Sequence, residues 1–503
     1  MTLSALKLLK ALGARLGWCL FGFLAGMLVI VYLWSQTRPE LSFWHDDEAR
    51  YLELAELANL DTASWPEYLA HEELQFAALN RLLAKKVKLG KSPSAPWHRF
   101  SPTGSGNPAL YPMNGNRSYW LRAAQKPRFK AVLIHGLTDS PYSLHAIADD
   151  LHAQGGEVLG LRVPGHGLLP GHLLNKRWED SRAAVAMAVR GAIRDDPATP
   201  VILVGYSNGA ALSVDYALEA LRDERLKQVS ALILISPALR VSSLASFAKL
   251  QLWLGKLPGL DNLAWVDIYP EYDPFKYNSF PVNAGQQIYE LTQAIQARLN
   301  DPEIRPLLSA FPATLIFQSA VDATVEPSAA VNDLLLKLPT HNNQLVLFDV
   351  DQLAQAKGYL KQQHQNLLAQ LANAELPFDY TLVTNPNGDR TISAIQRAAG
   401  SVVSTQQVLN LSWPENIYSL SHVALPIPAS DSVYGKKRSV EVPMHLGGGG
   451  SLGERGAFIV SMDQLSRLRY NPFYPYLQQR INRFVDNLTA NQSANHSANQ
   501  SQE

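Results

Sequence analysis

The sequence has almost no cysteine and no excess of either charge. Cys19 is the only cysteine among 503 residues, so the chain can form neither an internal disulfide nor a cysteine-ligated metal site. Its 44 basic residues balance 44 acidic ones. Nucleic-acid-binding proteins usually carry a basic excess, so this balance argues against that class. We found no internal repeat, and no motif calls for a metal ion or an organic cofactor.

Long apolar runs are scarce, with one exception near the N-terminus. Residues 16–37 carry no charged side chain, and as a helix they would span about 33 Å, enough to cross a bilayer. Trp18 and Trp34 fall near the two ends, where interfacial aromatic residues are expected. Basic residues precede the run and acidic residues follow it. We therefore expect a cytoplasmic N-terminus, with the rest of the chain on the periplasmic or other extracytoplasmic side.

A cleaved signal peptide is the alternative interpretation of this run. The apolar stretch is longer than most signal-peptide cores, and no small-x-small cleavage site follows Val31. Trp18 directly precedes Cys19, which argues against lipoprotein processing. We expect residues 1–37 to form a cytoplasmic tip and an uncleaved helix of a single-pass membrane protein.

The stretch around Ser207 combines a buried strand with a sharp turn. Residues 201–204 are four apolar residues, three of them Val or Ile, which suits a strand covered on both faces. The pentad Gly205-Tyr206-Ser207-Asn208-Gly209 follows, and small residues continue into a predicted helix. In such a strand-to-helix turn the serine hydroxyl projects away from the sheet. The pentad alone also fits an ordinary strand–turn–helix unit.

Strands alternate with helices over much of the chain. Buried strands are predicted near residues 130–134, 157–161, 201–206 and 231–235, with helical segments between them. This alternation is typical of a mostly parallel, doubly wound α/β sheet. The strand near residue 130 ends in His135-Gly136-Leu137, and a loop at this place can point a backbone N–H at a developing negative charge.

The alternation breaks between residues 240 and 312, where aromatic residues gather. An insertion over the carboxyl ends of the strands is where a lid would lie, and its aromatic content suits an apolar ligand. We expect Trp253, Trp265, Tyr272 and Phe275 to contact such a ligand. A helical subdomain that buries its own aromatic residues is the alternative, and the two interpretations are compatible.

Two later loops supply a candidate acid and a candidate base. Asp322 follows a buried strand that begins at Ala313, and a carboxylate there can orient an imidazole and stabilise its cationic form. His422 lies in a loop after a predicted strand at 408–411. The weaker rivals for the acid are Asp349 and Asp351, and the other histidines after Asp322 are His341, His364, His445 and His496.

The order serine, acid, histidine is the one expected of the α/β-hydrolase arrangement. From about residue 118 to 485 the chain resembles the α/β-hydrolase superfamily, closest to the monoacylglycerol lipase, lysophospholipase and bacterial carboxylesterase group. The matching residues are Ser207 with its flanking glycines, Asp322, His422, His135-Gly136-Leu137 and Pro164-Gly165-His166-Gly167. The resemblance implies a mostly parallel α/β sheet with a helical cap insertion.

The resemblance also implies a role for each site residue. Ser207 would attack an ester carbonyl, His422 would take its proton and later give it to the leaving alcohol, and Asp322 would hold the histidine tautomer. Backbone N–H groups of Leu137 and Asn208 would form the oxyanion hole. A covalent acyl-enzyme would form and be hydrolysed by water.

The chain departs from the usual pattern of that group. Asp322 and His422 are 100 residues apart instead of a few tens, so we expect an inserted lobe between them. The C-terminal residues lack apolar anchors and are expected to be disordered. The expected division is 1–37 tip and membrane helix, 38–117 helical arm and loop, 118–239 first half of the core, 240–312 cap, 313–486 second half with the inserted lobe at 344–410, and 487–503 tail.

The favoured function is a membrane-anchored serine esterase or lipase, acting on a monoacylglycerol- or lysophospholipid-like ester. An acyltransferase or a peptidase with the same three residues is an alternative, although the predicted cap offers few charged residues for a peptide amino group. A non-catalytic binding protein on a hydrolase fold is another. Serine rather than aspartate at position 207 argues against a dehalogenase or an epoxide hydrolase.

Overall fold

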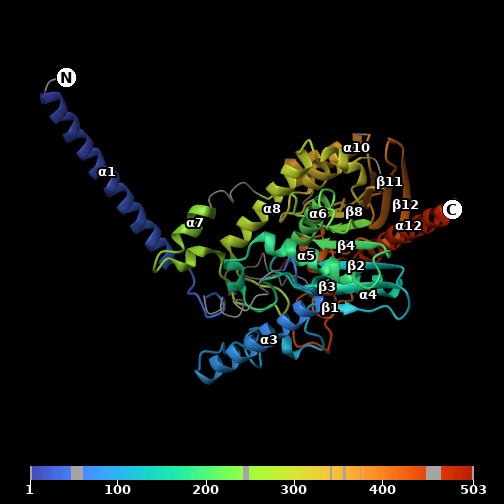
Figure 1. Ribbon diagram of the computed structural model, residues 1–503, viewed down its shortest axis with the longest axis horizontal. Helices are drawn as coiled ribbons and strands as arrows, with labels where there is room; N and C mark the ends of the chain where they lie inside the picture. The colour runs from blue at the N-terminus through green and yellow to red at the C-terminus, as the bar shows by residue number, and fades with distance from the viewer. Residues whose placement is uncertain are drawn as a thin grey trace.

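One central sheet of ten strands runs through the part of the chain that the structure describes (Figure 1). The computed structural model describes residues 3–46, 60–241, 248–339, 342–354, 358–373, 375–448 and 466–500. The strand order is β1-β3-β2-β4-β5-β8-β9-β10-β11-β12. The strands are β1 (Tyr119–Leu121), β2 (Phe129–Ile134), β3 (Gly156–Leu161), β4 (Val201–Tyr206), β5 (Ala231–Ile235), β8 (Ala313–Ser319), β9 (Gln344–Phe348), β10 (Asp379–Thr384), β11 (Thr391–Arg397) and β12 (Ser404–Ser412).

The sheet is parallel from β3 to β10, and this confirms the predicted fold class. β1 joins β3 in the antiparallel direction, and β11 and β12 complete the other edge as an antiparallel pair. Every residue of β2, β4 and β5 is buried. Such strands need apolar residues at consecutive positions, because helices cover both faces of a parallel sheet.

Two apolar cores lie on the two faces of the sheet, as β2 illustrates. Val132 and Ile134 point into one core, which contains α5 (Trp178–Ile193), α6 (Asn208–Ala220) and α8 (Val282–Asn300). Ala131 and Leu133 point into the other core, which contains α4 (His145–Ala153) and α12 (Tyr474–Gln500). This is the period-2 alternation of a strand with both faces buried.

Residues 344–410, which we expected to form an inserted lobe, instead extend the central sheet. β9 and β10 continue the parallel order beside β8, and β11 and β12 follow by antiparallel pairing. α10 (Gln362–Asn373) lies between β9 and β10 in the chain, as a crossover between parallel strands requires. Its Leu367 and Leu371 pack in the same core as α6. The additional strands account for the long spacing between Asp322 and His422.

The expected cap contains a core helix as well as a cover. α8 packs in the core with α5 and α6. The part of the expected cap that forms a cover is therefore the stretch that precedes α8 in the sequence. That part contains α7 (Ala248–Leu254), a 3-10 turn at Asp261–Ala264, and the short strands β6 (Trp265–Asp267) and β7 (Phe280–Pro281), which pair with each other.

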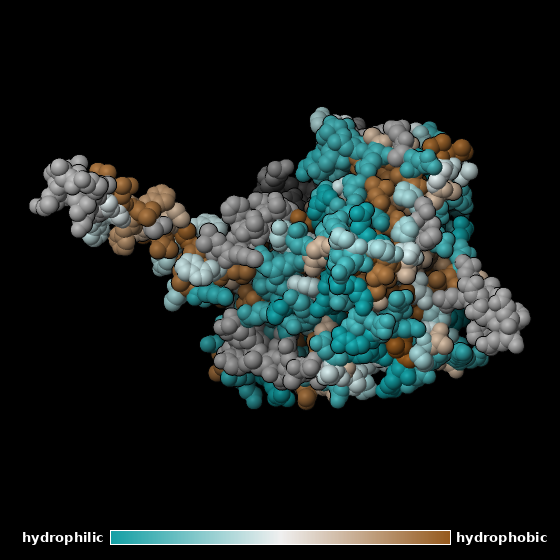
Figure 2. All heavy atoms as spheres, turned by 45° about the horizontal axis from the view of Figure 1, so that its top comes forward, coloured by the Kyte–Doolittle hydropathy of each residue, from teal (hydrophilic) through white to brown (hydrophobic). Residues whose placement is uncertain are grey.

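Both ends of the described chain are helical. α1 (Leu3–Gln36) projects from the rest of the molecule (Figures 1 and 2). Its stretch Arg15–Gln36 is long and apolar enough to cross a membrane, a test that a signal sequence also passes. At the other end α12 continues to Gln500, where we expected a disordered tail from residue 487. The packed first turns of α12 nucleate the helix, and extension beyond a nucleus costs little for each residue.

The arm α3 (Trp65–Lys88) packs against the sheet through a buried ion pair. Ser64 caps its first turn in a reciprocal capping box with Glu67. In the middle of the helix, Glu72 is 2% exposed, and its carboxylate accepts from Arg162 Nε at 2.9 Å. It also accepts from the backbone N–H and the hydroxyl of Ser118, at 2.9 and 2.8 Å. The arm is therefore joined to the loop after β3.

We expect Glu72→Gln to lower the free energy of unfolding by about 3 kcal/mol, because it removes the negative charge of a buried carboxylate that accepts from the Arg162 guanidinium. The neighbouring Glu73→Gln is the matched control, since Glu73 pairs with Arg117 on the surface and should change stability by less than about 1 kcal/mol. Urea unfolding in detergent, followed by tryptophan fluorescence, measures both. Equal effects of the two variants would contradict a structural role for the buried pair.

Candidate active site

Ser207 occupies the turn between β4 and α6 in a strained backbone conformation. Its φ is 55° and its ψ is −114°, a combination that residues with a side chain seldom adopt. The surrounding strand ends hold this conformation. The Ser207 N–H donates to the carbonyl of Ile235 at 2.9 Å, and the Ser207 carbonyl accepts from the N–H of Ala238 at 3.2 Å. The turn presents the serine side chain at the end of the sheet.

Two glycines make this turn possible. A Cβ atom on Gly209 would lie 1.9 Å from the carbonyl oxygen of Ile134, and one on Gly205 would lie 2.4 Å from Cα of Ala210. Both distances are far below van der Waals contact, so α6 can begin this close to β2 and β4 only with glycine at both positions. This is the steric reason for the pentad in the sequence.

His422 and Asp322 lie together at the same end of the sheet. His422 Nδ1 is 2.7 Å from Asp322 Oδ2, and both side chains are buried. Asp322 Oδ1 also accepts from the backbone N–H groups of Thr324 and Val325, at 2.8 and 3.1 Å. Burial alone would raise the pKa of Asp322, but His422 and these donors outweigh burial and hold that pKa below its usual value. An ionised Asp322 fixes the proton of His422 on Nδ1.

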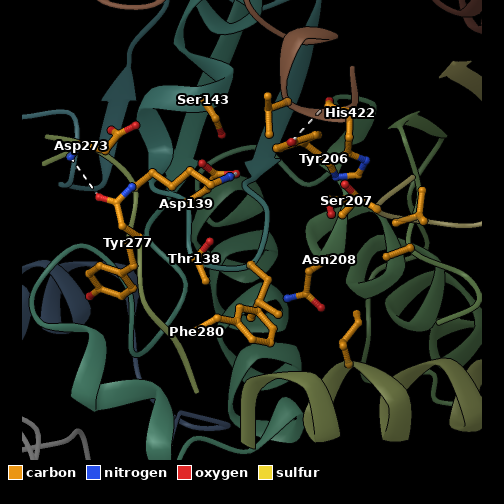
Figure 3. A pocket seen from close by; sticks show the side chains of 18 of the residues that line it. Thr138, Asp139, Ser143, Tyr206, Ser207, Asn208, Asp273, Tyr277, Phe280 and His422 are labelled. Carbon is orange, nitrogen blue, oxygen red and sulfur yellow. Dashed lines mark hydrogen bonds and ion pairs between the residues drawn. The ribbon is translucent and has the colours of Figure 1, made fainter. Parts of the chain in front are cut away.

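The imidazole of His422 lies next to the side chain of Ser207 (Figure 3). The loop that carries His422 is attached to the sheet at Ser319, whose hydroxyl donates to the carbonyl of Leu420 at 2.8 Å. Ser319 is the last residue of β8, three positions before Asp322. Its role was missed in the sequence, because a serine at the end of a strand carries no motif.

The rival acids and bases have structural partners elsewhere. Asp349 accepts from the hydroxyl of Thr384, and Asp351 accepts from the side-chain amide of Asn385, each at 2.8 Å. Two of the histidine rivals also have partners: His364 bonds to the Ala320 carbonyl, and His445 bonds to the Gly435 carbonyl. None of these four lines the cavity in front of Ser207 in the part of the chain that the structure describes. His341 lies outside the described residues.

Leu137 and Asn208, the expected oxyanion-hole residues, both line that cavity. Asn208 is the first residue of α6, so its N–H has no partner within the helix. Leu137 follows β2 in a loop where Thr138 has a φ of 64°. The Thr138 carbonyl accepts from the N–H of Tyr277 at 2.8 Å, which ties the loop to the cap.

His135, at the end of β2, is a structural residue of this loop. Its Nε2 accepts from the N–H of Val163 at 3.0 Å, so Nδ1 carries the hydrogen and donates to the Gly136 carbonyl at 2.8 Å. Burial, with nearby His166 and Arg162, holds the pKa of His135 well below its usual value. The neutral ring thereby connects the loop after β2 to the loop after β3.

A cavity of about 640 Å³ opens in front of Ser207 (Figure 3). Of the four cap aromatic residues that we expect to contact a ligand, Phe275 lines this cavity, and Trp253, Trp265 and Tyr272 do not. Trp265 is wholly buried beside His45, with ring centroids 4.8 Å apart. Tyr272 accepts from Arg469 Nη2 at 3.0 Å. Trp253 is 59% exposed on α7. Aromatic composition gave the location of the cap but not the direction of each ring.

The cavity wall also carries charged pairs that we did not predict. Asp273 bonds to Arg469 at 3.2 Å and accepts from the hydroxyl of Tyr434. Asp139 lies 3.6 Å from Lys276. Burial raises the pKa of Asp139, although Lys276 opposes the rise. Asp139 comes from the loop after β2, and the other members come from the cap and from the C-terminal third of the chain, so no local pattern could reveal the pairs.

Arg467 differs from the other two cations that line the cavity. Its Nη2 donates to the Thr324 hydroxyl at 2.8 Å, beside the Asp322 loop. Among the residues that the structure describes, it has no carboxylate partner, whereas Lys276 and Arg469 each have one. Arg467 is therefore the cation on this wall that a bound anion can reach without breaking an ion pair.

Comparison with known proteins agrees with the fold. Residues 125–350 match the family described as serine aminopeptidase, S33. Together with the parallel sheet and the strained serine turn, this match shows that the chain has the α/β-hydrolase fold. No curated protein matches the sequence.

Several solved structures are similar to part of the chain. A metagenome-derived lipolytic enzyme is 19% identical with a TM-score of 0.36, covering 52% of this chain and 99% of its own. A monoacylglycerol lipase from Paleococcus ferrophilus is 19% identical with a TM-score of 0.34, covering 46% and 89%. A soluble variant of monoglyceride lipase from Saccharomyces cerevisiae is 16% identical with a TM-score of 0.35, covering 48% and 89%. At these values the likeness carries no argument about substrate.

We expect Lys276→Met to lower the free energy of unfolding by about 2 kcal/mol at pH 7, because it leaves the buried Asp139 carboxylate without its nearest cation. A carboxyl whose pKa is higher in the folded than in the unfolded state loses stability as the pH rises through the folded pKa. The defect should therefore shrink as the pH falls towards 4. Thermal unfolding between pH 4 and pH 7 measures it.

The double variant Asp139→Asn/Lys276→Met is the control for this pair. It removes both charges, so most of the stability lost at pH 7 should return. A defect in Lys276→Met that is independent of pH, or one that the double variant does not relieve, would contradict a role for the pair.

Proposed function

We propose that the protein is a serine hydrolase that cleaves carboxylic esters through Ser207, His422 and Asp322. The observation that carries this proposal is the 2.7 Å bond between His422 and Asp322, next to a serine held in a strained turn on the cavity floor. A serine hydroxyl is a weak nucleophile until an adjacent base takes its proton. A histidine with Nδ1 held by a carboxylate keeps Nε2 available for that task.

The reaction would proceed in two acyl-transfer steps. The Ser207 oxygen attacks the ester carbonyl while His422 Nε2 takes the hydroxyl proton, and Asp322 stabilises the imidazolium that forms. The carbonyl oxygen becomes negatively charged and accepts from the N–H groups of Leu137 and Asn208. Breakage of the ester bond gives the acyl-enzyme, and His422 passes its proton to the leaving alcohol. Water, activated by the same histidine, then releases the acid.

The cavity wall suits an ester with an apolar acyl chain. Apolar side chains line the cavity, among them Phe275, Phe280, Val282, Ile288 and Ile427. A volume of about 640 Å³ lies within the usual range of about 300–1,000 Å³ for ligand sites. With α1 as a membrane anchor, we infer a lipid-like ester such as a monoacylglycerol or a lysophospholipid.

A peptidase is the second candidate, because the matched family is described as a serine aminopeptidase. An aminopeptidase would need a carboxylate free to bind the substrate amino group. Asp273 is occupied by Arg469 and Tyr434, and Asp139 is paired with Lys276. Burial raises the pKa of Asp267, and the nearby Arg38 opposes the rise, but no ion pair to Asp267 is present among the described residues. Two of the three carboxylates that line the cavity in the described chain are thus engaged in ion pairs, and this favours the ester over the peptide.

We expect the full chain in detergent to hydrolyse p-nitrophenyl esters, with its highest kcat/KM for medium or long acyl chains. Ser207→Ala should abolish turnover, and Asp322→Asn should lower kcat by about 10⁴-fold, because the asparagine no longer holds the correct histidine tautomer. Asp389→Asn, which changes an exposed carboxylate that does not line the cavity, is the matched control and should retain full activity.

The same assay separates the alternatives. Faster cleavage of aminoacyl p-nitroanilides than of any ester would replace the esterase with a peptidase. Transfer of the acyl group to an added alcohol in preference to water would identify an acyltransferase. A folded protein that turns over none of these substrates would support a non-catalytic binding role.

Arg467 offers a test of the substrate head group. If the substrate is a lysophospholipid, the guanidinium is available to bind its phosphate, so Arg467→Ala should raise KM for the lysophospholipid about tenfold and leave kcat nearly unchanged. KM for the neutral monoacylglycerol with the same acyl chain should not change. Equal effects on both esters would contradict recognition of an anionic group, and Arg467→Lys should restore part of the loss.

A further inference from the structure

The last turn of α1 packs against the cap. The side-chain amide of Asn262 donates to the Ser35 carbonyl at 2.6 Å, and Arg38 Nη2 donates to the Val266 carbonyl at 2.7 Å. A Cβ atom on Gly259 would find Tyr32 as its nearest neighbour, at 3.9 Å. Residues 259–266 of the cap therefore lie along the end of the candidate membrane helix (Figure 1).

The segment after α1 continues into the cap and is fixed there by His45. His45 Nδ1 accepts from the N–H of Ser42 at 3.1 Å, so Nε2 carries the hydrogen and donates to the Ser279 hydroxyl at 2.9 Å. The ring lies against Trp265, with centroids 4.8 Å apart. Burial, with His98 nearby, lowers the pKa of His45 to about 3, so the His45 ring is uncharged at neutral pH.

The cap residues that contact α1 also border the cavity in front of Ser207. Val266 and Asp267 line the cavity, and so does Gln251 of α7. The side-chain amide of Gln251 donates to the Leu263 carbonyl at 2.9 Å, which connects α7 to the same stretch. The short cap segment around Val266 thus contacts the end of α1 and also borders the cavity.

Exposed apolar side chains gather around this junction. Trp253 of α7 is 59% exposed and Val266 of β6 is 48% exposed. On α1, Leu33 and Trp34 are 58% and 51% exposed. We call these four residues the junction surface. Figure 1 shows α7 next to the end of α1, and Figure 2 shows the apolar helix emerging from this side of a mostly hydrophilic body.

We propose that the junction surface contacts a lipid bilayer, and that the cavity takes its ester directly from that bilayer. If Arg15–Gln36 crosses the membrane, its 22 residues span about 33 Å, so Trp34 and Ser35 lie at the membrane–water boundary. The cap stretch bonded to Ser35 and Arg38 then lies at the same depth. Tryptophan is the residue that prefers this interfacial region, which suits both Trp34 and Trp253.

The second part of the proposal, uptake of the ester from the bilayer, rests on the proposed ester hydrolysis. The contact itself follows from the bonds between α1 and the cap, whatever the reaction is. It gives α1 a second role besides anchoring, because the helix fixes the depth of the cavity wall relative to the lipid. Direct uptake would spare an apolar ester the cost of crossing water.

Depth-dependent quenching tests the contact in the full chain. In a Cys19→Ser background, a single cysteine replaces Trp253 or, as the matched control, Val408. Val408 is 61% exposed on β12, an edge strand of the central sheet that is not part of the junction surface. Each cysteine carries an environment-sensitive fluorophore, and the protein is reconstituted into vesicles that contain brominated phosphatidylcholine. We expect quenching at position 253 at least threefold stronger than at position 408; equal quenching at the two positions would overturn the proposal.

A second measurement tests uptake from the bilayer. Trp253→Asp should lower the hydrolysis of a long-chain ester embedded in vesicles about tenfold and leave the hydrolysis of a water-soluble short-chain ester unchanged, because Trp253 does not line the cavity. Unchanged hydrolysis of both esters would overturn direct uptake. If the unmodified protein hydrolyses neither ester, the proposed function fails, and the quenching experiment still decides whether the junction surface meets lipid.

Discussion

The hydrogen bond between His422 and Asp322 joins two loops that lie 100 residues apart, and the candidate site depends on it. Each partner is supported by β8. Asp322 follows this strand directly and is fixed by N–H groups of its own loop, while Ser319 at the end of the strand bonds to the backbone of the histidine loop. Because β8 pairs with β5, the acid and base have a fixed position relative to Ser207. The sheet thus brings residues that are far apart in the sequence next to one another.

The same geometry explains why distant parts of the chain meet at the cavity. Its walls come from the loop after β2, from the cap, and from Ile427, Tyr434, Arg467 and Arg469 near the C-terminus. Ion pairs cross between these parts, as between Arg469 and Asp273 and between Lys276 and Asp139. Such pairs contribute little as isolated contacts on a surface, but beside a cavity they fix which charges a ligand can reach. The remaining cation, Arg467, lies beside the loop of the acid.

Some of this architecture could be predicted from sequence, for identifiable reasons. The parallel strands were predictable because strands buried on both faces, such as β4, need uninterrupted apolar residues. The strained turn at Ser207 was predictable because Gly205 and Gly209 have steric reasons to be glycine. Asp322 and His422 could be placed in loops after strands, but only the structure brings them together.

The errors have physical reasons too. Residues 344–410 were interpreted as a lobe because of the long spacing between Asp322 and His422, and the edge strand β12, whose residues are mostly exposed and polar, carries little signal of a continuing sheet. The aromatic residues of the cap were assigned to a ligand by composition, but Trp265 is buried against His45 and Trp253 faces outwards. The end of α12 follows from helix propagation, which composition alone did not reveal.

The central claim is that Ser207 is a nucleophile activated by His422. Treatment of the full chain with a fluorophosphonate, followed by mass spectrometry of its peptides, tests this claim most directly, because the reagent bonds covalently to an activated serine. The account predicts one adduct per chain, on the peptide that contains Ser207. An unmodified Ser207 in folded protein, or an adduct on another serine, would contradict it.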